Sequence, residues 1–202
     1  MKTLHKTYFL SLALISLLFF GSCGDDDSST DSISILPFSI VDDTTIRLNG
    51  EINSNTENAF DEVIRQNPNT ELLIFGEAPG SADDEVNLRV GRKLFQMGLN
   101  THVEDNGLIA SGAVDLFLAG ARRTLGSNTR VGVHSWSDGT NEATDFPRSS
   151  PEHLFFINYY RDIGFTDQRA EDFYFFTIEA APAADIHWMT PAELAQYEIT
   201  TN

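Results

Sequence analysis

The sequence contains very little cysteine and little positive charge. Its single cysteine, Cys23, leaves the rest of the chain without a disulfide, so the fold must depend on its hydrophobic core. Lys and Arg together number 13 against 30 Asp and Glu, and the formal charge is −17. This balance argues against nucleic acid and anionic lipid surfaces as partners. The sequence also lacks internal repeats and Pro-rich linkers, so the roughly 170 residues that follow the N-terminal segment are one ordinary domain's length.

The first 22 residues have the pattern of a secretory signal peptide. Lys2 and Lys6 precede an apolar run, residues 7–20, which is too short to span a bilayer comfortably because a span needs about 20 residues. The run ends in Gly-Ser before Cys23, and small residues before a lone cysteine resemble the lipobox of bacterial lipoproteins, although Phe20 stands where those proteins usually have Leu. The resemblance implies that Cys23 is lipidated and becomes the new N-terminus. The other interpretation is an ordinary secretory signal followed by a spare cysteine.

An acidic, Ser-rich segment without large apolar residues follows Cys23. Such a segment cannot bury a core, so we expect a solvated tether over residues 23–32 and a folded domain over residues 33–202. Loss of Lys2 and Lys6 with the signal peptide takes the net charge from −17 to −19. Acidic residues after a lipid-bearing cysteine resemble the surface-export signals of Gram-negative lipoproteins. The resemblance implies a cell-envelope protein whose lipid anchor sits in the outer membrane, on its periplasmic or surface face.

Strand and helix patterns alternate along the domain. The expected strands cover residues 33–41, 45–50, the apolar run within 70–80, 101–105, 129–136 and 185–189. The expected helices cover residues 55–68, 83–98, a segment that opens at Ser111, 151–164, 167–181 and 190–197, with Thr56 and Thr190 as N-caps. This alternation predicts an α/β domain with a largely parallel sheet.

Three segments follow strands of this expected sheet, and they carry the candidate chemistry. In parallel sheets, ligands bind at the loops after the carboxyl ends of the strands, which here are residues 77–81, 107–112 and 134–136. Among their side chains, Ser111 and His134 suit a nucleophile and its base, because a serine hydroxyl attacks poorly unless an imidazole takes its proton. The alternatives are that Ser111 caps the helix that follows it and that His134 is a core histidine.

Four motifs in this order and spacing resemble the ClpP/crotonase superfamily. They are FGEAPGSADDEV, GLIASGAVDLFLAG, TRVGVHSW and WMTPAELAQYEI, and the resemblance extends over residues 45–200. Within the superfamily, the chain is most similar to ClpP-like serine peptidases and their secreted or periplasmic relatives. The resemblance implies a ClpP/crotonase-like fold of repeated β-β-α units with a largely parallel sheet.

The resemblance also assigns roles to individual residues. Ser111 matches the nucleophile and His134 the general base. Gly112 matches the residue after the nucleophile, whose backbone N–H helps to bind the oxyanion. A second oxyanion donor lies in a Pro-Gly-Gly turn, which appears here as residues 79–81, so that Gly80 is expected to donate and Ser81 replaces the second glycine.

The triad acid of the family precedes a segment like WMTPAEL. Asp185 is the nearest carboxylate upstream of that segment, and Glu179 and Asp162 are the alternatives. A carboxylate in this role orients the imidazole and stabilises its charged form. His102, His153 and His187 show no paired ligand spacing, so we assign no metal and expect no cofactor.

Two functions from different classes follow from these residues. The first is a membrane-anchored, exported serine hydrolase, a peptidase with a peptide or protein substrate and an acyl-enzyme intermediate. Family precedent then implies a homo-oligomer. The second is a non-catalytic surface lipoprotein that keeps the fold and binds a ligand or a protein partner. An acyl-CoA enzyme of the crotonase type fits less well, because an exported compartment supplies no coenzyme A.

Overall fold

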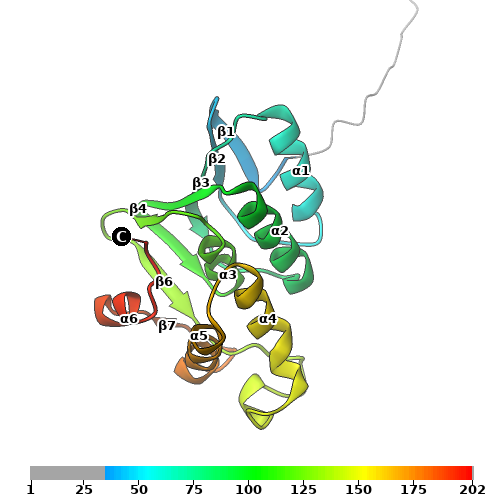
Figure 1. The fold of residues 1–202 in the computed structure, drawn as a ribbon, viewed down its shortest axis with the longest axis vertical. Coiled ribbons are helices and arrows are strands. Elements are labelled where there is room, and N and C mark those ends of the chain that lie inside the picture. The colour runs from blue at the N-terminus through cyan, green and yellow to red at the C-terminus, as the bar shows by residue number, and fades with distance from the viewer. Residues whose placement is uncertain (1–34, 202) are drawn as a thin grey trace, which may run out of the picture. The chain divides into compact units, whose positions relative to one another are not determined.

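The computed structural model describes residues 35–201, which form a seven-stranded sheet with helices packed around it (Figure 1). The predicted signal peptide, the lipidation of Cys23 and the tether over residues 23–32 lie outside the described residues. Among residues 35–201, no helix combines the length and the apolar character needed to cross a membrane.

The sheet is parallel at its centre and antiparallel at both edges. Its strand order is β1-β2-β3-β4-β6-β7, and β5 pairs with β4 beside this path. The pairs β2–β3, β3–β4, β4–β5 and β4–β6 are parallel, whereas β1–β2 and β6–β7 are antiparallel. The predicted α/β class with a largely parallel sheet is confirmed. The strands are β1 (Phe38–Asp42), β2 (Thr45–Leu48), β3 (Leu72–Ala78), β4 (Asn100–Ala110), β5 (Arg123–Leu125), β6 (Arg130–Val133) and β7 (His187–Trp188).

The helices begin and end close to the predicted positions, with one wrong cap. Thr190 accepts a hydrogen bond from the amide of Glu193 and caps the last helix, as predicted. Thr56 is instead the first residue of its helix, and its hydroxyl accepts from the amide of Asn53 (2.8 Å). The helices are α1 (Thr56–Gln66), α2 (Asp84–Met97), α3 (Gly112–Leu118), α4 (Leu154–Asp162), α5 (Asp167–Ala180) and α6 (Pro191–Gln196), with 3-10 turns η1 (Ala143–Asp145) and η2 (Pro151–His153).

Strand β4 is much longer than predicted and runs directly into α3. Its pairing with β3 passes from Phe75↔Val103 to Glu77↔Leu108, so that β4 carries three more residues than β3 in this interval. The polar residues of this bulge interrupt the apolar pattern, which explains why the sequence suggested a strand over 101–105 only. Residues 107–110, expected as a loop, are strand. The chain therefore passes from strand to helix at a single residue, Ser111.

Helix α3 is buried on all sides, unlike the amphipathic helices α1 and α2. All seven of its residues are buried, and it packs between α2 and the sheet strands β4 and β6. A short helix fixed in this way has little freedom to move. The start of α3 is therefore a rigid platform for the residue that precedes it.

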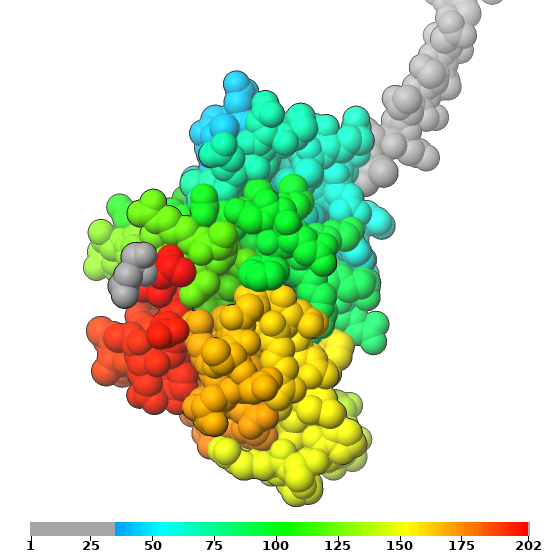
Figure 2. Space-filling model, in the orientation of Figure 1, coloured from blue at the N-terminus to red at the C-terminus, as the bar shows by residue number. Residues whose placement is uncertain are grey.

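The C-terminal residues are fastened to the sheet by Arg123 on β5. Its guanidinium donates to the backbone carbonyl oxygens of Ile199 (2.9 Å), Glu198 (3.2 Å) and Gly120 (3.0 Å). The backbone of Arg123 also pairs with Thr201. Figure 2 shows the result on the surface, where the last residues, in red, lie against the green part of the chain.

Candidate active site

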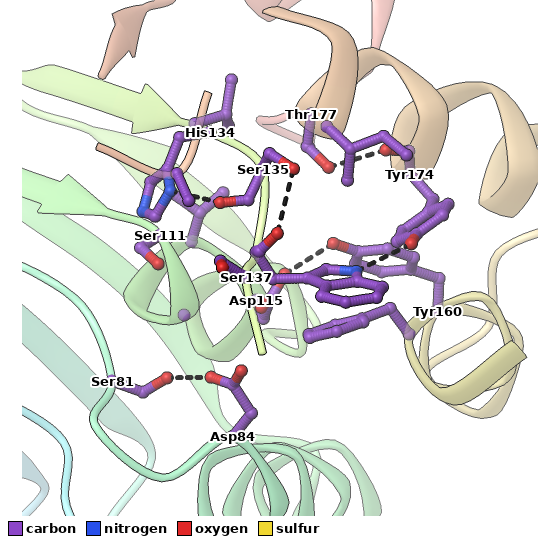
Figure 3. Close-up of a pocket in the computed structure, with 17 residues that line it drawn as sticks. Ser81, Asp84, Ser111, Asp115, His134, Ser135, Ser137, Tyr160, Tyr174 and Thr177 are labelled. Carbon is purple, nitrogen blue, oxygen red and sulfur yellow. Dashed lines mark hydrogen bonds between the residues drawn. The ribbon is translucent and has the colours of Figure 1, made fainter. Parts of the chain in front are cut away.

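A cavity of about 360 Å³ opens where three neighbouring strands end. Ala78 of β3 pairs with Ile109 of β4, and Ala110 pairs with Gly132 of β6, so the residues that follow these strands lie close together. The three segments expected to carry the chemistry therefore do converge (Figure 3). The lining residues are Ser81, Asp84, Ser111, Gly112, Val114, Asp115, Val133, His134, Ser135, Trp136, Ser137, Phe156, Tyr160, Tyr174, Thr177, Ile178 and Ala183.

Ser111 has a backbone conformation that side chains rarely adopt. Its φ is 52° and its ψ is −133°, a region that is almost restricted to glycine and costs a non-glycine residue about 1–3 kcal/mol. The residue occupies the N-cap position of α3, but its hydroxyl accepts no capping hydrogen bond; the amide of Val114 binds its backbone carbonyl instead (2.8 Å). The interpretation of Ser111 as a capping side chain is therefore wrong. Its hydroxyl faces the cavity.

His134 stands directly after β6 and lines the same cavity as Ser111 (Figure 3). Its Nδ1 lies 2.6 Å from the carbonyl oxygen of Ser135. Because a carbonyl oxygen only accepts hydrogen bonds, Nδ1 carries the proton and Nε2 keeps its lone pair. His134 is half-buried, so it is not the core histidine of the alternative interpretation; that place belongs to His153, which is 1% exposed.

Two glycines lie beside Ser111, one in the turn after β3 and one at the start of α3. A Cβ on Gly80, whose φ is 146°, would lie 3.0 Å from the Cβ of Ser111 and 3.5 Å from its Oγ. A Cβ on Gly112 would lie only 2.3 Å from the Oγ of Ser81, so glycine is needed for this approach. The amides of Gly80 and Gly112 donate no hydrogen bond within residues 35–201. Both glycines therefore lie next to Ser111, and their role as oxyanion donors stays a prediction.

The turn that contains Gly80 is held against α3 by polar side chains. Ser81 donates to the carboxylate of Asp84 at the start of α2. Asn87, further along α2, is buried and donates to the carbonyl oxygen of Gly112 (2.7 Å). These contacts fix the two glycine amides relative to each other, which matters because oxyanion donors act by being preorganised.

Asp115 is a cavity residue that the sequence analysis missed. It lies on α3 four residues after Ser111, is 8% exposed, and its Oδ1 accepts from the hydroxyl of Tyr160 (2.6 Å). Burial, with a smaller contribution from the nearby Asp84, raises the pKa of Asp115 to about 7 against the opposing effect of the Tyr160 hydrogen bond. The available signal was a single carboxylate within the otherwise apolar segment GAVDLFL.

Aromatic side chains form the wall opposite α3. The indole N–H of Trp136 donates to the hydroxyl of Tyr174 (2.9 Å), which in turn contacts Nδ1 of His153 (2.8 Å). Nε2 of His153 reaches the carbonyl oxygen of Pro147 (3.1 Å). Since that carbonyl only accepts, Nε2 carries the proton and Tyr174 donates to Nδ1. Each polar group in this series of hydrogen bonds has a partner, and the series holds Trp136 in place at the cavity.

The overall architecture matches solved structures of serine proteases. ClpP1 from Listeria monocytogenes superposes with a TM-score of 0.51 at 16% identity, over 77% of this chain and 88% of that chain. A mutant of the same ClpP1 gives a TM-score of 0.52 at 16% identity, over 78% and 89% of the two chains. A mutant of the 1510-N membrane-bound stomatin-specific protease, in complex with a substrate peptide, gives a TM-score of 0.50 at 19% identity, over 78% and 72%. The chain has a ClpP-like fold. No family model and no curated protein matches its sequence.

In this ClpP-like fold, none of the three proposed triad acids reaches His134. The carboxylate of Asp185 is exposed and accepts from the neighbouring amide of Ile186 (2.8 Å). Glu179 pairs with Arg148 and Asp162 with Arg92, and all three acids lie outside the cavity lining. The carbonyl of Ser135 occupies the Nδ1 position that a triad acid would take. No hydrogen bond or ion pair joins Asp185 to His134 within residues 35–201, so Asp185 as the acid that orients His134 stays a prediction without a supporting contact.

The ClpP-like domain offers no grouping of metal ligands in its described part. Among residues 35–201, no three His, Cys, Asp or Glu side chains lie close enough together to hold a metal ion. Of the histidines considered as ligands, His102 contacts Thr124, His153 contacts Tyr174, and His187 contacts Glu193. Each of these histidines therefore has a structural partner, and among those partners only Tyr174 lines the cavity.

Proposed function

We propose that this protein is an exported serine hydrolase, a peptidase that forms an acyl-enzyme on Ser111. The observation that carries the proposal is the strained backbone of Ser111 at the corner between β4 and α3. That strain is not used for helix capping, because the hydroxyl makes no cap, and a strained strand-to-helix corner is the arrangement that presents nucleophilic serines in other hydrolases.

The surrounding groups supply what the reaction needs. His134 takes the proton of the Ser111 hydroxyl on Nε2 as the oxygen attacks the substrate carbonyl. The amides of Gly80 and Gly112 donate to the oxyanion of the tetrahedral intermediate. The imidazolium then gives its proton to the leaving amine, and a water molecule, deprotonated by His134, hydrolyses the acyl-enzyme. The carbonyl of Ser135 holds the orientation of the ring.

The cellular setting is a proposal from the sequence alone. Residues 1–22 are the signal peptide, Cys23 carries the lipid, and residues 23–32 connect it to the domain. We place the protein in the cell envelope of a Gram-negative bacterium, at the outer membrane. Peptides or proteins are its substrates, and the chain forms a homo-oligomer.

Labelling with a fluorophosphonate tests the nucleophile. The purified mature protein should acquire one covalent adduct, which peptide mass spectrometry locates on Ser111. Ser111→Ala should abolish labelling, and His134→Ala should slow it by about 100-fold or more, because the base contributes typically 10²–10⁴-fold. His102→Ala is the matched control, since His102 contacts Thr124 and does not line the cavity, and it should label like the parent.

A non-catalytic surface lipoprotein is the alternative function. One observation favours it: within residues 35–201, the ring of His134 makes no hydrogen bond with Ser111 or with a carboxylate. A folded protein that takes up no fluorophosphonate would support this alternative, and the cavity would then be a binding site only.

A further inference from the structure

Only one of the two carboxylate oxygens of Asp115 has a hydrogen-bond partner within residues 35–201. Its Oδ1 accepts from Tyr160, whereas Oδ2 takes part in no hydrogen bond or ion pair within residues 35–201. Asp115 nevertheless lines the cavity and is 8% exposed. A carboxylate with less than a tenth of its surface exposed normally has a cationic partner. No Lys or Arg lines this cavity.

The rest of the cavity suits a positively charged group. Besides Asp115, the lining includes the carboxylate of Asp84 and the aromatic rings of Trp136, Phe156 and Tyr174. Aromatic faces attract ammonium and guanidinium groups, and they also pack against the apolar stems of such side chains. The chain as a whole carries a charge of −17, which raises the local concentration of cationic peptides.

Asp115 is also well placed relative to the proposed nucleophile. It lies in the first turn of α3, the helix that begins directly after Ser111, and both residues line the same cavity. Figure 3 shows Asp115 between Ser111 and the aromatic wall, inside the same cavity. A substrate whose carbonyl carbon sits at Ser111 can therefore direct the side chain of the same residue toward Asp115.

We propose that this cavity binds a lysine or arginine side chain of the substrate and that Asp115 is its anionic partner. The proposal rests on the hydrolase function of Ser111 and names the substrate class of that same site. It makes Asp115 a specificity residue, which selects the residue whose carbonyl is attacked and takes no part in bond breaking.

The pH dependence of binding follows from the groups that face Asp115. These are Asp84 on α2, Tyr159 and Tyr160 on α4, and His134 after β6. Burial raises the pKa of both tyrosines well above 10, so they stay neutral near pH 7. Asp115, with a pKa of about 7, is mostly neutral at pH 6 and mostly ionised at pH 8. A cationic side chain should therefore bind more tightly at pH 8 than at pH 6.

Equilibrium binding of a matched peptide pair tests the proposal without any turnover. The protein is the full chain with Ser111→Ala and Trp188→Phe, which leaves Trp136 as the single tryptophan and as a fluorescent reporter in the cavity. The probes are acetyl-Ala-Ala-Arg-amide and the same peptide with citrulline, which is nearly isosteric with arginine but neutral. At pH 8 the arginine peptide should bind at least about 10-fold more tightly, and at pH 6 this preference should shrink.

Two further variants separate the charge of Asp115 from its structural role. Asp115→Asn should make the two peptides bind equally. Tyr160→Phe removes the hydrogen bond to Oδ1 but keeps the carboxylate, so it should preserve the arginine preference. If Asp115→Asn does not fold, the peptide pair and its pH dependence on the protein with Asp115 intact still decide the question.

Three results would overturn the proposal: equal binding of the two peptides, an arginine preference that survives Asp115→Asn, or no binding of either peptide. Fluorophosphonate labelling of the protein with Ser111 restored reports separately on the hydrolase function. An arginine preference without labelling would leave the cation site and reject the hydrolase. Labelling without an arginine preference would leave the hydrolase and reject the cation site.

Discussion

Arg123 and Asp115 are both charged residues with less than a tenth of their surface exposed, yet their surroundings differ. The guanidinium of Arg123 donates to three backbone carbonyl oxygens, which join β5 to the C-terminal residues. Burial, with a contribution from Arg169, lowers its pKa to about 10, so it remains charged at neutral pH. Asp115 has one tyrosine hydroxyl as its partner, and burial raises its pKa to about 7.

The difference in hydrogen-bond partners shows that the charge of Arg123 supports the fold, whereas the charge of Asp115 does not. Arg123 stabilises the fold because the carbonyl oxygens of Ile199 and Gly120 have no other hydrogen-bond donor within residues 35–201, whereas that of Glu198 also accepts from Arg169. Asp115 costs stability whenever it is ionised, because its burial is not compensated by a cation. A buried charge that the fold does not neutralise is typical of a functional site, which is the role we propose for the Ser111 cavity.

Replacement of Arg123 should give the largest effect. Arg123→Met leaves the carbonyl oxygens of Ile199 and Gly120 without a donor, while that of Glu198 keeps its bond from Arg169, and each buried unsatisfied group costs about 1–3 kcal/mol. We expect the free energy of unfolding, measured with urea, to fall by about 3 kcal/mol or more. Arg122→Met is the matched control: its side chain is exposed, so the change should stay within about 0.5 kcal/mol. If the two substitutions lowered the free energy of unfolding equally, Arg123 would not be a charge that supports the fold.

Asp115→Asn should act in the opposite direction and depend on pH. The pKa of Asp115 rises from 3.8 to about 7 on folding, so the folded state binds the proton more tightly and stability falls as pH rises through this interval. At about 1.4 kcal/mol for each pKa unit, the variant should be more stable than the parent by up to about 4 kcal/mol at pH 8, with the gain fading toward pH 4. Urea unfolding at both pH values measures this difference.

Asp43→Asn is the control for that experiment, since Asp43 is an exposed acid and its replacement should change the free energy of unfolding by no more than about 0.5 kcal/mol. A loss of stability in Asp115→Asn at pH 8 would show that the carboxylate supports the fold, as Arg123 does. The contrast between the two buried charges would then disappear.

Gly80→Ala should have a smaller effect on stability and a clear effect on reactivity. The new Cβ would press on Ser111 at 3.0 Å, and the φ of 146° strains any side chain. We expect about 1–2 kcal/mol of destabilisation and a fall of about 10-fold or more in the rate of fluorophosphonate labelling, because the Gly80 amide can no longer hold its place. Gly139→Ala has a positive φ of 89° but nothing within 4 Å, so it should share the strain and leave labelling unchanged. Equal labelling of the two variants would argue against the turn at Gly80 as part of the site.

Much of the fold and part of the site were predictable because they follow from local pattern. The strands and helices show in the apolar spacing, and the parallel order of β3, β4 and β6 brings Gly80, Ser111 and His134 to one edge. The bulge in β4 was not predictable, since its polar residues read as the end of a strand.

Contacts between distant segments were the main features that the sequence could not supply. Asp115 meets Tyr160 across 45 positions of the chain, and nothing local indicates that pairing. The partner of His134 is a backbone carbonyl, which every residue possesses, so a search among carboxylates led to Asp185 instead. Triad acids are recognised by geometry and not by their place in the sequence.

The acyl-enzyme on Ser111 is the central claim, and time-resolved mass spectrometry with an activated ester tests it most directly. The mature protein, mixed with p-nitrophenyl acetate, should carry an acetyl group on Ser111 that appears within the mixing phase and disappears once the ester is exhausted. Ser111→Ala should show no such adduct. A folded protein that never carries acetyl on Ser111, or an adduct that persists unchanged in Ser111→Ala, would contradict the claim.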